Sequence, residues 1–160
     1  MSREIDTQSY LNTVCALLEE GKRTVPVPVA GVSMVPFLFP GDTVFLDRPQ
    51  TPLCCGDVVL FTRADGQYVL HRIAAVYPDG SFEMLGDGQV QRERVPDAGR
   101  IRARVSLAQH KGKTMRPGGL RWWFFARAWQ WAEPLRPRLL AIYRRLYAQR
   151  FQTRTEGDNQ

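Results

Sequence analysis

The chain has 160 residues, of which 44% are hydrophobic and 24% charged. This length and composition predict one globular domain with a substantial core and exclude a largely disordered protein. The net charge of +6 is unevenly placed: residues 1–115 sum to zero, whereas 116–154 carry nine arginines against one acid, Glu133. The basic character therefore belongs to the C-terminal third.

No marker of a metal site or a membrane span is present. The cysteines, Cys15, Cys54 and Cys55, form no CxxC pair, and only His71 and His110 could add nitrogen ligands, so we expect no disulfide framework and no metal. The first thirty residues lack a signal-peptide pattern, and no window reaches the roughly 18 apolar residues of a transmembrane helix. We expect a cytoplasmic or peripherally membrane-associated chain with no signal peptide and no transmembrane span.

Hydrophobic periodicity predicts one amphipathic helix within residues 1–23, starting near Asp6 and ending at Gly21. Its apolar stripe consists of Tyr10, Leu11, Val14, Leu17 and Leu18. Strand patterns follow at 24–29, 42–48, 57–63, 67–77, 81–87 and 101–109. The two prolines in the first of these suit only an edge strand. Short connections containing Asp-Gly separate the strands, so we predict a compact antiparallel β unit over 24–115.

Residues 116–154 predict a basic, aromatic helical tail, broken near Pro134 and Pro137, and we expect 155–160 to be disordered. The fold class is therefore mainly β, with an N-terminal helix and C-terminal helices, α+β overall.

Three polar residues in the β unit could form a catalytic set. Ser33 follows a strand in a turn, His71 lies in the middle of a strand, and Asp87 ends a later strand in LGDG. A serine hydroxyl becomes nucleophilic when a neighbouring base takes its proton, and a carboxylate can orient that base. The alternative is that Ser33 caps a turn, His71 is a hydrogen-bonded core residue and Asp87 belongs to a turn.

The order of whole phrases favours the catalytic interpretation. GVSMVP, PGDTVFLDRP, CGDVVLF, VLHRIAAV and LGDGQV, over about residues 24–109, resemble the shared core of the signal peptidase I and LexA-like serine peptidases. The histidine in an HR phrase, followed later by a GD phrase, is similar to the endoplasmic reticulum and archaeal signal peptidases. The resemblance implies Ser33 as nucleophile, His71 as general base and Asp87 as the acid that orients it.

The match departs from the family at one position of the site. Many signal peptidases have a hydroxyl residue two positions before the nucleophile, where this chain has Gly31, so the oxyanion would depend on backbone N–H groups such as that of Ser33. The resemblance also implies substrate contacts by Met34 and Pro36. The strand at 24–29 is a candidate platform for an extended peptide.

We therefore predict a serine endopeptidase that cleaves a precursor or signal-type peptide through an acyl-enzyme, without metal or organic cofactor. Two alternatives remain: a non-catalytic peptide- or membrane-binding module on the same fold, and a self-cleaving regulator of LexA type. The tail adds a further partner hypothesis, because arginine and aromatic side chains favour the headgroup level of an anionic membrane. The residues proposed for that contact are Trp122, Trp123, Trp129, Arg144 and Arg145. The alternative is that the aromatic face of the tail packs on the β unit and its arginines face the solvent. We expect no nucleic-acid binding, since no recognition motif accompanies the basic residues.

Overall fold

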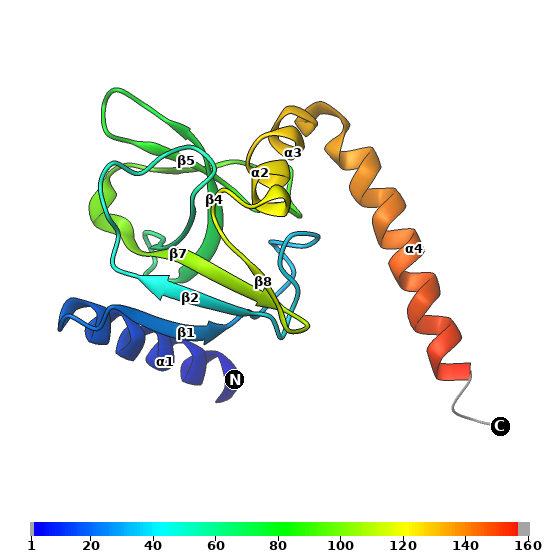
Figure 1. Cartoon of the computed structure of the whole chain (residues 1–160), viewed down its shortest axis with the longest axis horizontal. Coiled ribbons are helices and arrows are strands. Elements are labelled where there is room, and N and C mark those ends of the chain that lie inside the picture. Colours follow the sequence, from blue (N-terminus) through cyan, green and yellow to red (C-terminus); the bar gives the residue numbers. More distant parts are fainter. Residues whose placement is uncertain (1, 157–160) are drawn as a thin grey trace.

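The structure, a computed structural model, describes the backbone of residues 2–156 and the side chains of residues 7–146. Helix α1 (Ser2–Glu19) precedes the strands, and a helical segment ends the chain (Figure 1). The strands are β1 (Thr24–Pro28), β2 (Thr43–Asp47), β3 (Val58–Thr62), β4 (Tyr68–Val76), β5 (Phe82–Leu85), β6 (Glu93–Val95), β7 (Ile101–His110) and β8 (Lys113–Met115). The prediction of a mainly antiparallel β fold with helices at both ends is confirmed.

Helix α1 lies along β1 and covers one side of the sheet (Figure 1). Val14 and Leu18 of the predicted apolar stripe are buried in the larger core cluster, whereas Tyr10 remains exposed. The helix begins before the expected cap at Asp6 and ends just ahead of Gly21, whose φ of +99° is a conformation that favours glycine.

The strands form one antiparallel sheet with the order β1-β2-β7-β3-β4-β5-β6, and β8 pairs with β7. β1 is a terminal strand, as its prolines predict, since Pro26 and Pro28 cannot donate to a neighbouring strand. β5 forms hydrogen-bonded pairs with β4 only from Arg72 onward. One edge of the first half of β4 is therefore left without a strand neighbour, as is the outer edge of β1.

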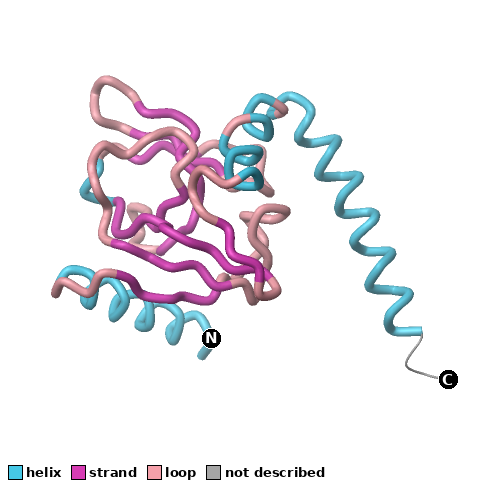
Figure 2. Tube along the Cα trace, in the orientation of Figure 1, coloured by secondary structure: helices cyan, strands magenta, loops and turns pink. Residues whose placement is uncertain are grey.

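The C-terminal segment is more broken than the sequence suggests (Figure 2). It contains α2 (Leu120–Ala126), α3 (Ala128–Trp131), the 3-10 turn η2 (Glu133–Leu135) and α4 (Arg136–Glu156). Pro137 lies in the first turn of α4, where proline is tolerated, and does not interrupt the helix. Helix α4 continues to Glu156, so the expectation of disorder from 155 is wrong for its first two residues. Residues 157–160 lie outside the described residues.

None of the helices in residues 2–156 is long and apolar enough to cross a membrane.

Candidate active site

Ser33 lies in a pair of tight turns between β1 and β2. The Val35 N–H donates to the Val32 carbonyl at 3.1 Å, and the Phe37 N–H donates to the Met34 carbonyl at 2.9 Å. Gly31, two residues before Ser33, has a φ of +77°. A residue with a side chain would be strained in this conformation, so the turn itself accounts for glycine where many signal peptidases have a hydroxyl residue.

The LGDG phrase places a second loop directly against this turn. The Gly88 N–H donates to the Ser33 carbonyl at 2.8 Å. A Cβ added at Gly86 would lie 2.5 Å from the Ser33 carbonyl oxygen, and one at Gly88 would lie 2.5 Å from the Val35 carbonyl oxygen. Both glycines are therefore needed because two backbones meet here, which is the physical reason for their spacing around Asp87.

His71 approaches the same point from β4. A Cβ added at Gly86 would lie 3.1 Å from His71 Nε2 and 2.5 Å from the Ser33 carbonyl oxygen. The histidine nitrogen and the serine carbonyl oxygen are therefore at most 5.6 Å apart. Ser33 and His71 line one cavity of about 230 Å³. Its other walls are the segment following β1, from Val29 to Gly31, and the free first half of β4. The structure thus brings two of the three predicted site residues together.

The third does not join them as predicted. The Asp87 carboxylate is bound by Arg72, with Nη2 at 2.7 Å and Nε at 3.0 Å, and both side chains are fully buried. His71 Nδ1 is buried without a hydrogen-bond partner, and no hydrogen bond joins His71 to the Ser33 hydroxyl, although all of these groups belong to the described residues. The expectation that an Asp87 oxygen approaches the His71 ring is therefore wrong in this structure.

Strand geometry explains the difference. Consecutive residues of a strand point to opposite faces, so His71 and Arg72 cannot both face Ser33. The His71 ring lies beside Phe61, with centroids 6.0 Å apart, in the smaller core cluster. Arg72 points the other way, where it stacks over Phe37 at 4.6 Å and donates to the Gly56 carbonyl at 2.8 Å. Asp87 lies on the Arg72 side and neutralises this buried guanidinium.

The surroundings of His71 keep its ring uncharged. Burial lowers the pKa of His71 from 6.5 to about 4, the nearby Glu93 carboxylate opposes this shift, and Arg63 adds to it. At neutral pH the imidazole is therefore free to accept a proton, although as a weaker base than an exposed histidine. The histidine that does contact a carboxylate is His110, whose Nδ1 lies 2.7 Å from Asp42 Oδ1.

The remaining predicted site residues differ in their positions. No hydrogen bond within the described residues uses the Ser33 N–H. Met34 lines the cavity and is otherwise buried. Pro36 is not among the lining residues; its carbonyl instead accepts a hydrogen bond from Arg121 at 3.1 Å.

Sequence analysis missed the residues that hold the two loops in place, which come from the C-terminal helices. Trp129 Nε1 donates to the Asp87 carbonyl at 2.9 Å, and Arg121 reaches the Phe37 carbonyl at 2.9 Å. Arg136, fully buried, donates to the Gln89 carbonyl at 3.2 Å. The signal available in the sequence was the dense mixture of tryptophan and arginine, which predicts either a membrane surface or an aromatic face packed on the β unit.

Two of the proposed membrane contacts are consequently wrong. Trp122 is 5% exposed and packs edge-on against Phe37 at 5.2 Å, and Trp129 is half-buried over the Asp87 loop. Trp123, Arg144 and Arg145 are exposed. The tail is thus partly a structural support of the site.

Among the residues that the structure describes, no group of three or more histidine, cysteine, aspartate or glutamate side chains is arranged to hold a metal ion. Neither a family model nor a curated protein matches the chain.

Proposed function

We propose that the chain is a serine endopeptidase of the signal-peptidase-like class, with Ser33 as nucleophile and His71 as general base. The observation that carries the proposal is the shared cavity: a serine on a glycine-supported turn and an uncharged histidine lie in one cavity between two strand edges. A hydroxyl and a proton-accepting imidazole in that arrangement are the minimum for acyl transfer.

In the proposed reaction the Ser33 hydroxyl attacks the carbonyl carbon of the scissile bond while His71 Nε2 takes its proton. The oxyanion accepts a hydrogen bond from the Ser33 N–H. Collapse of the tetrahedral species breaks the C–N bond, and His71 returns the proton to the leaving amine. A water molecule, deprotonated by the same imidazole, then hydrolyses the Ser33 ester and releases the acid product.

The substrate is proposed to bind as an extended strand. A second cavity, of about 420 Å³, adjoins the first on the α1 side and is lined mostly by apolar residues. The two cavities share Val29, Ala30, Tyr68 and Leu70. Tyr68 and Leu70 belong to the edge of β4 that has no strand neighbour, and this edge is proposed to offer backbone hydrogen bonds to a peptide. The apolar cavity offers a place for one of the peptide's side chains.

The test is labelling by a fluorophosphonate probe, which acylates activated serines, together with hydrolysis of a mixture of unstructured peptides. Ser33→Ala and His71→Ala should each abolish labelling and hydrolysis. Ser106→Ala and His110→Ala are matched controls outside the cavity, and both should retain activity. Peptide hydrolysis that survives in Ser33→Ala would refute the assignment.

A non-catalytic peptide-binding module is the second candidate. The observation in its favour is that His71 Nδ1 has no hydrogen-bond partner and that no hydrogen bond links His71 to Ser33. This candidate predicts that an apolar peptide binds wild type and Ser33→Ala equally, with no labelling of either.

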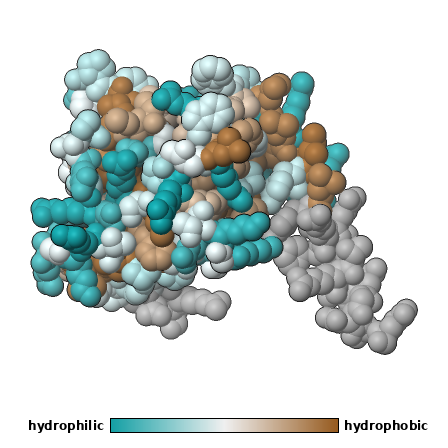
Figure 3. All heavy atoms as spheres, in the orientation of Figure 1, coloured by the Kyte–Doolittle hydropathy of each residue, from teal (hydrophilic) through white to brown (hydrophobic). Residues whose placement is uncertain are grey.

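We also propose a peripheral contact with an anionic membrane, by a set of residues that shares only Arg145 with the one expected. Leu139, Ile142 and Leu146 form an exposed stripe on α4, and Trp131 on α3 is 85% exposed. Figure 3 shows hydrophobic residues on this side of the molecule, interspersed with hydrophilic ones. Arg138 and Arg145 flank the stripe at helical spacing, where they could reach lipid headgroups.

A further inference from the structure

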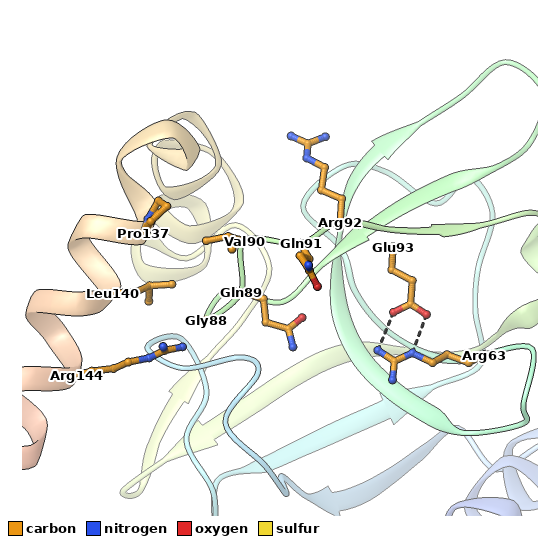
Figure 4. Close-up of a pocket in the computed structure, with 10 residues that line it drawn as sticks. All are labelled: Arg63, Gly88, Gln89, Val90, Gln91, Arg92, Glu93, Pro137, Leu140 and Arg144. Carbon is orange, nitrogen blue, oxygen red and sulfur yellow. Dashed lines mark hydrogen bonds and ion pairs between the residues drawn. The ribbon is translucent and has the colours of Figure 1, made fainter.

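A cavity of about 590 Å³ lies on the α4 side of the candidate active site (Figure 4). Its walls are the segment 88–93 and the first turns of α4, with Arg63 beyond them. Arg63 and Gln89 also line the cavity that holds Ser33 and His71. The two cavities therefore adjoin, and a peptide that crosses Ser33 towards α4 would enter the larger one.

Most charges in this region neutralise one another. Arg63 donates to both oxygens of Glu93, at 2.7 and 2.8 Å, as the dashed lines in Figure 4 show. Arg92 is bound by Glu83 and Glu133. Two arginines thus face three glutamates, and these ion pairs leave one negative charge in excess.

Two arginines of α4 belong to none of these ion pairs. Arg136 is fully buried, its Nε has no hydrogen-bond partner, and its other nitrogens donate only to backbone carbonyls and an amide oxygen. Arg144 lines the cavity, and in Figure 4 it extends from α4 towards Gln89; within the described side chains it has no carboxylate partner. Eight residues, about 12 Å along the helix, separate them. Arg144 lines the cavity, whereas Arg136 lies behind its wall and donates to the Gln89 carbonyl.

We infer that this cavity binds a carboxylate of the peptide substrate, with Arg144 as the contacting cation and the amides of Gln89 and Gln91 as further donors. The inference rests on the proposed function and adds the substrate class: an extended peptide with an apolar side chain on the α1 side of the cleaved bond and a carboxylate on the α4 side. The buried charge of Arg136 offsets the one glutamate in excess, which leaves the charge of Arg144 for the ligand. The carboxylate belongs either to an aspartate or glutamate side chain or to the end of the peptide.

Direct binding tests the inference without any need for turnover. The Ser33→Ala chain is titrated with three short probes while backbone and arginine Nε–Hε resonances are followed by NMR. The probes are acetyl-Glu-Glu-amide, acetyl-Gln-Gln with a free terminal carboxylate, and the fully neutral acetyl-Gln-Gln-amide. We expect a carboxylate probe to bind about threefold to tenfold more tightly than the neutral one, as for a partly exposed ion pair, and to shift residues 88–92. Comparison of the two carboxylate probes identifies the source of the charge.

The variant Arg144→Gln should remove the difference between charged and neutral probes. Arg145→Gln is the matched control, because it removes the same charge from the next residue, which does not line the cavity. Equal binding of all three probes, shifts confined to other surfaces, or loss of preference in Arg145→Gln alone would overturn the inference.

Cleavage of a randomised peptide mixture then separates this inference from the proposed function. Acidic residues or termini should be enriched on one side of the cleaved bonds for wild type and not for Arg144→Gln. Cleavage without that enrichment refutes the carboxylate site and leaves the peptidase intact. No cleavage refutes the peptidase, and the NMR result alone then decides whether the cavity binds carboxylates.

Discussion

Substitution of Asp87 distinguishes a structural role from a catalytic one. In the catalytic triad implied by the family resemblance, Asp87→Asn would leave a stable protein with weak activity. Among the side chains that the structure describes, Asp87 is the only carboxylate bound to the fully buried Arg72, so the same change leaves a buried guanidinium without its counter-charge. We therefore expect the main effect of Asp87→Asn to be a lower free energy of unfolding.

The magnitude follows from the burial of the pair. Removal of one partner of a fully buried, hydrogen-bonded ion pair costs about 3–5 kcal/mol. Arg72 keeps its hydrogen bond to the Gly56 carbonyl and its stacking on Phe37, so we expect the lower part of this range. For a domain of this size that loss lowers the melting temperature by roughly 6–12 °C.

Urea denaturation followed by tryptophan fluorescence gives the free energy of unfolding. Asp79→Asn is a matched control, because Asp79 also binds an arginine, Arg94, at 2.9 Å, but both side chains are about 60% exposed; this variant should unfold close to wild type. The double variant Arg72→Met/Asp87→Asn should recover part of the stability lost by Asp87→Asn, since it removes the unpaired charge.

One result would refute this reasoning. If Asp87→Asn unfolds at the same urea concentration as wild type and yet loses peptide hydrolysis, then Asp87 acts on His71 during turnover, and the arrangement of the resting structure does not describe the working site.

Two further predictions concern pH and membranes. The fold lowers the pKa of His71 from 6.5 to about 4, so the unfolded chain binds more protons than the folded one between these values. The free energy of unfolding should therefore fall with decreasing pH, by up to about 3 kcal/mol relative to a His71→Asn variant. Urea titrations of both proteins at pH 7 and pH 4.5 measure this difference. The acid limb of kcat/KM should likewise lie nearer pH 4 than 6.5, and a limb at 6.5 would contradict the burial of the ring. In vesicle flotation the full chain should bind anionic lipid and lose binding with added salt. The triple variant Trp131→Ser/Leu139→Ser/Ile142→Ser should not bind, whereas Tyr10→Ser, on the opposite end of the molecule, should behave as wild type. Flotation of the triple variant at the wild-type level would refute this membrane surface.

The regular strands could be predicted from sequence because alternation and turn residues are local signals. All six predicted strands are present, with bounds within one or two residues. The missing ones, β6 and β8, have three residues each and exist because longer strands offer an edge to pair with. Such short strands carry no pattern of their own, so only the tertiary structure defines them.

The site was predictable in part, for a similar reason. Ser33 and His71 could be located because each lies in a recognisable phrase. The partner of Asp87 was not apparent, although one signal existed: Arg72 follows His71 in a strand, so it must point to the opposite face, and a buried arginine needs a buried acid. The support by Trp129 and Arg136 depends on how the chain returns to the β unit, which periodicity does not encode.

The C-terminal helices pack back on the β unit through Trp129 and Arg136, and this affects the order in which the site forms during synthesis. Arg136 is made 49 residues after Asp87, a delay of about 2–10 s at typical rates of translation. The Asp87 loop and the Ser33 turn have left the ribosome's catalytic centre long before their last hydrogen-bond donors exist. A nascent chain can therefore form its sheet while its candidate site is still loosely held, and the site tightens only when translation is nearly complete.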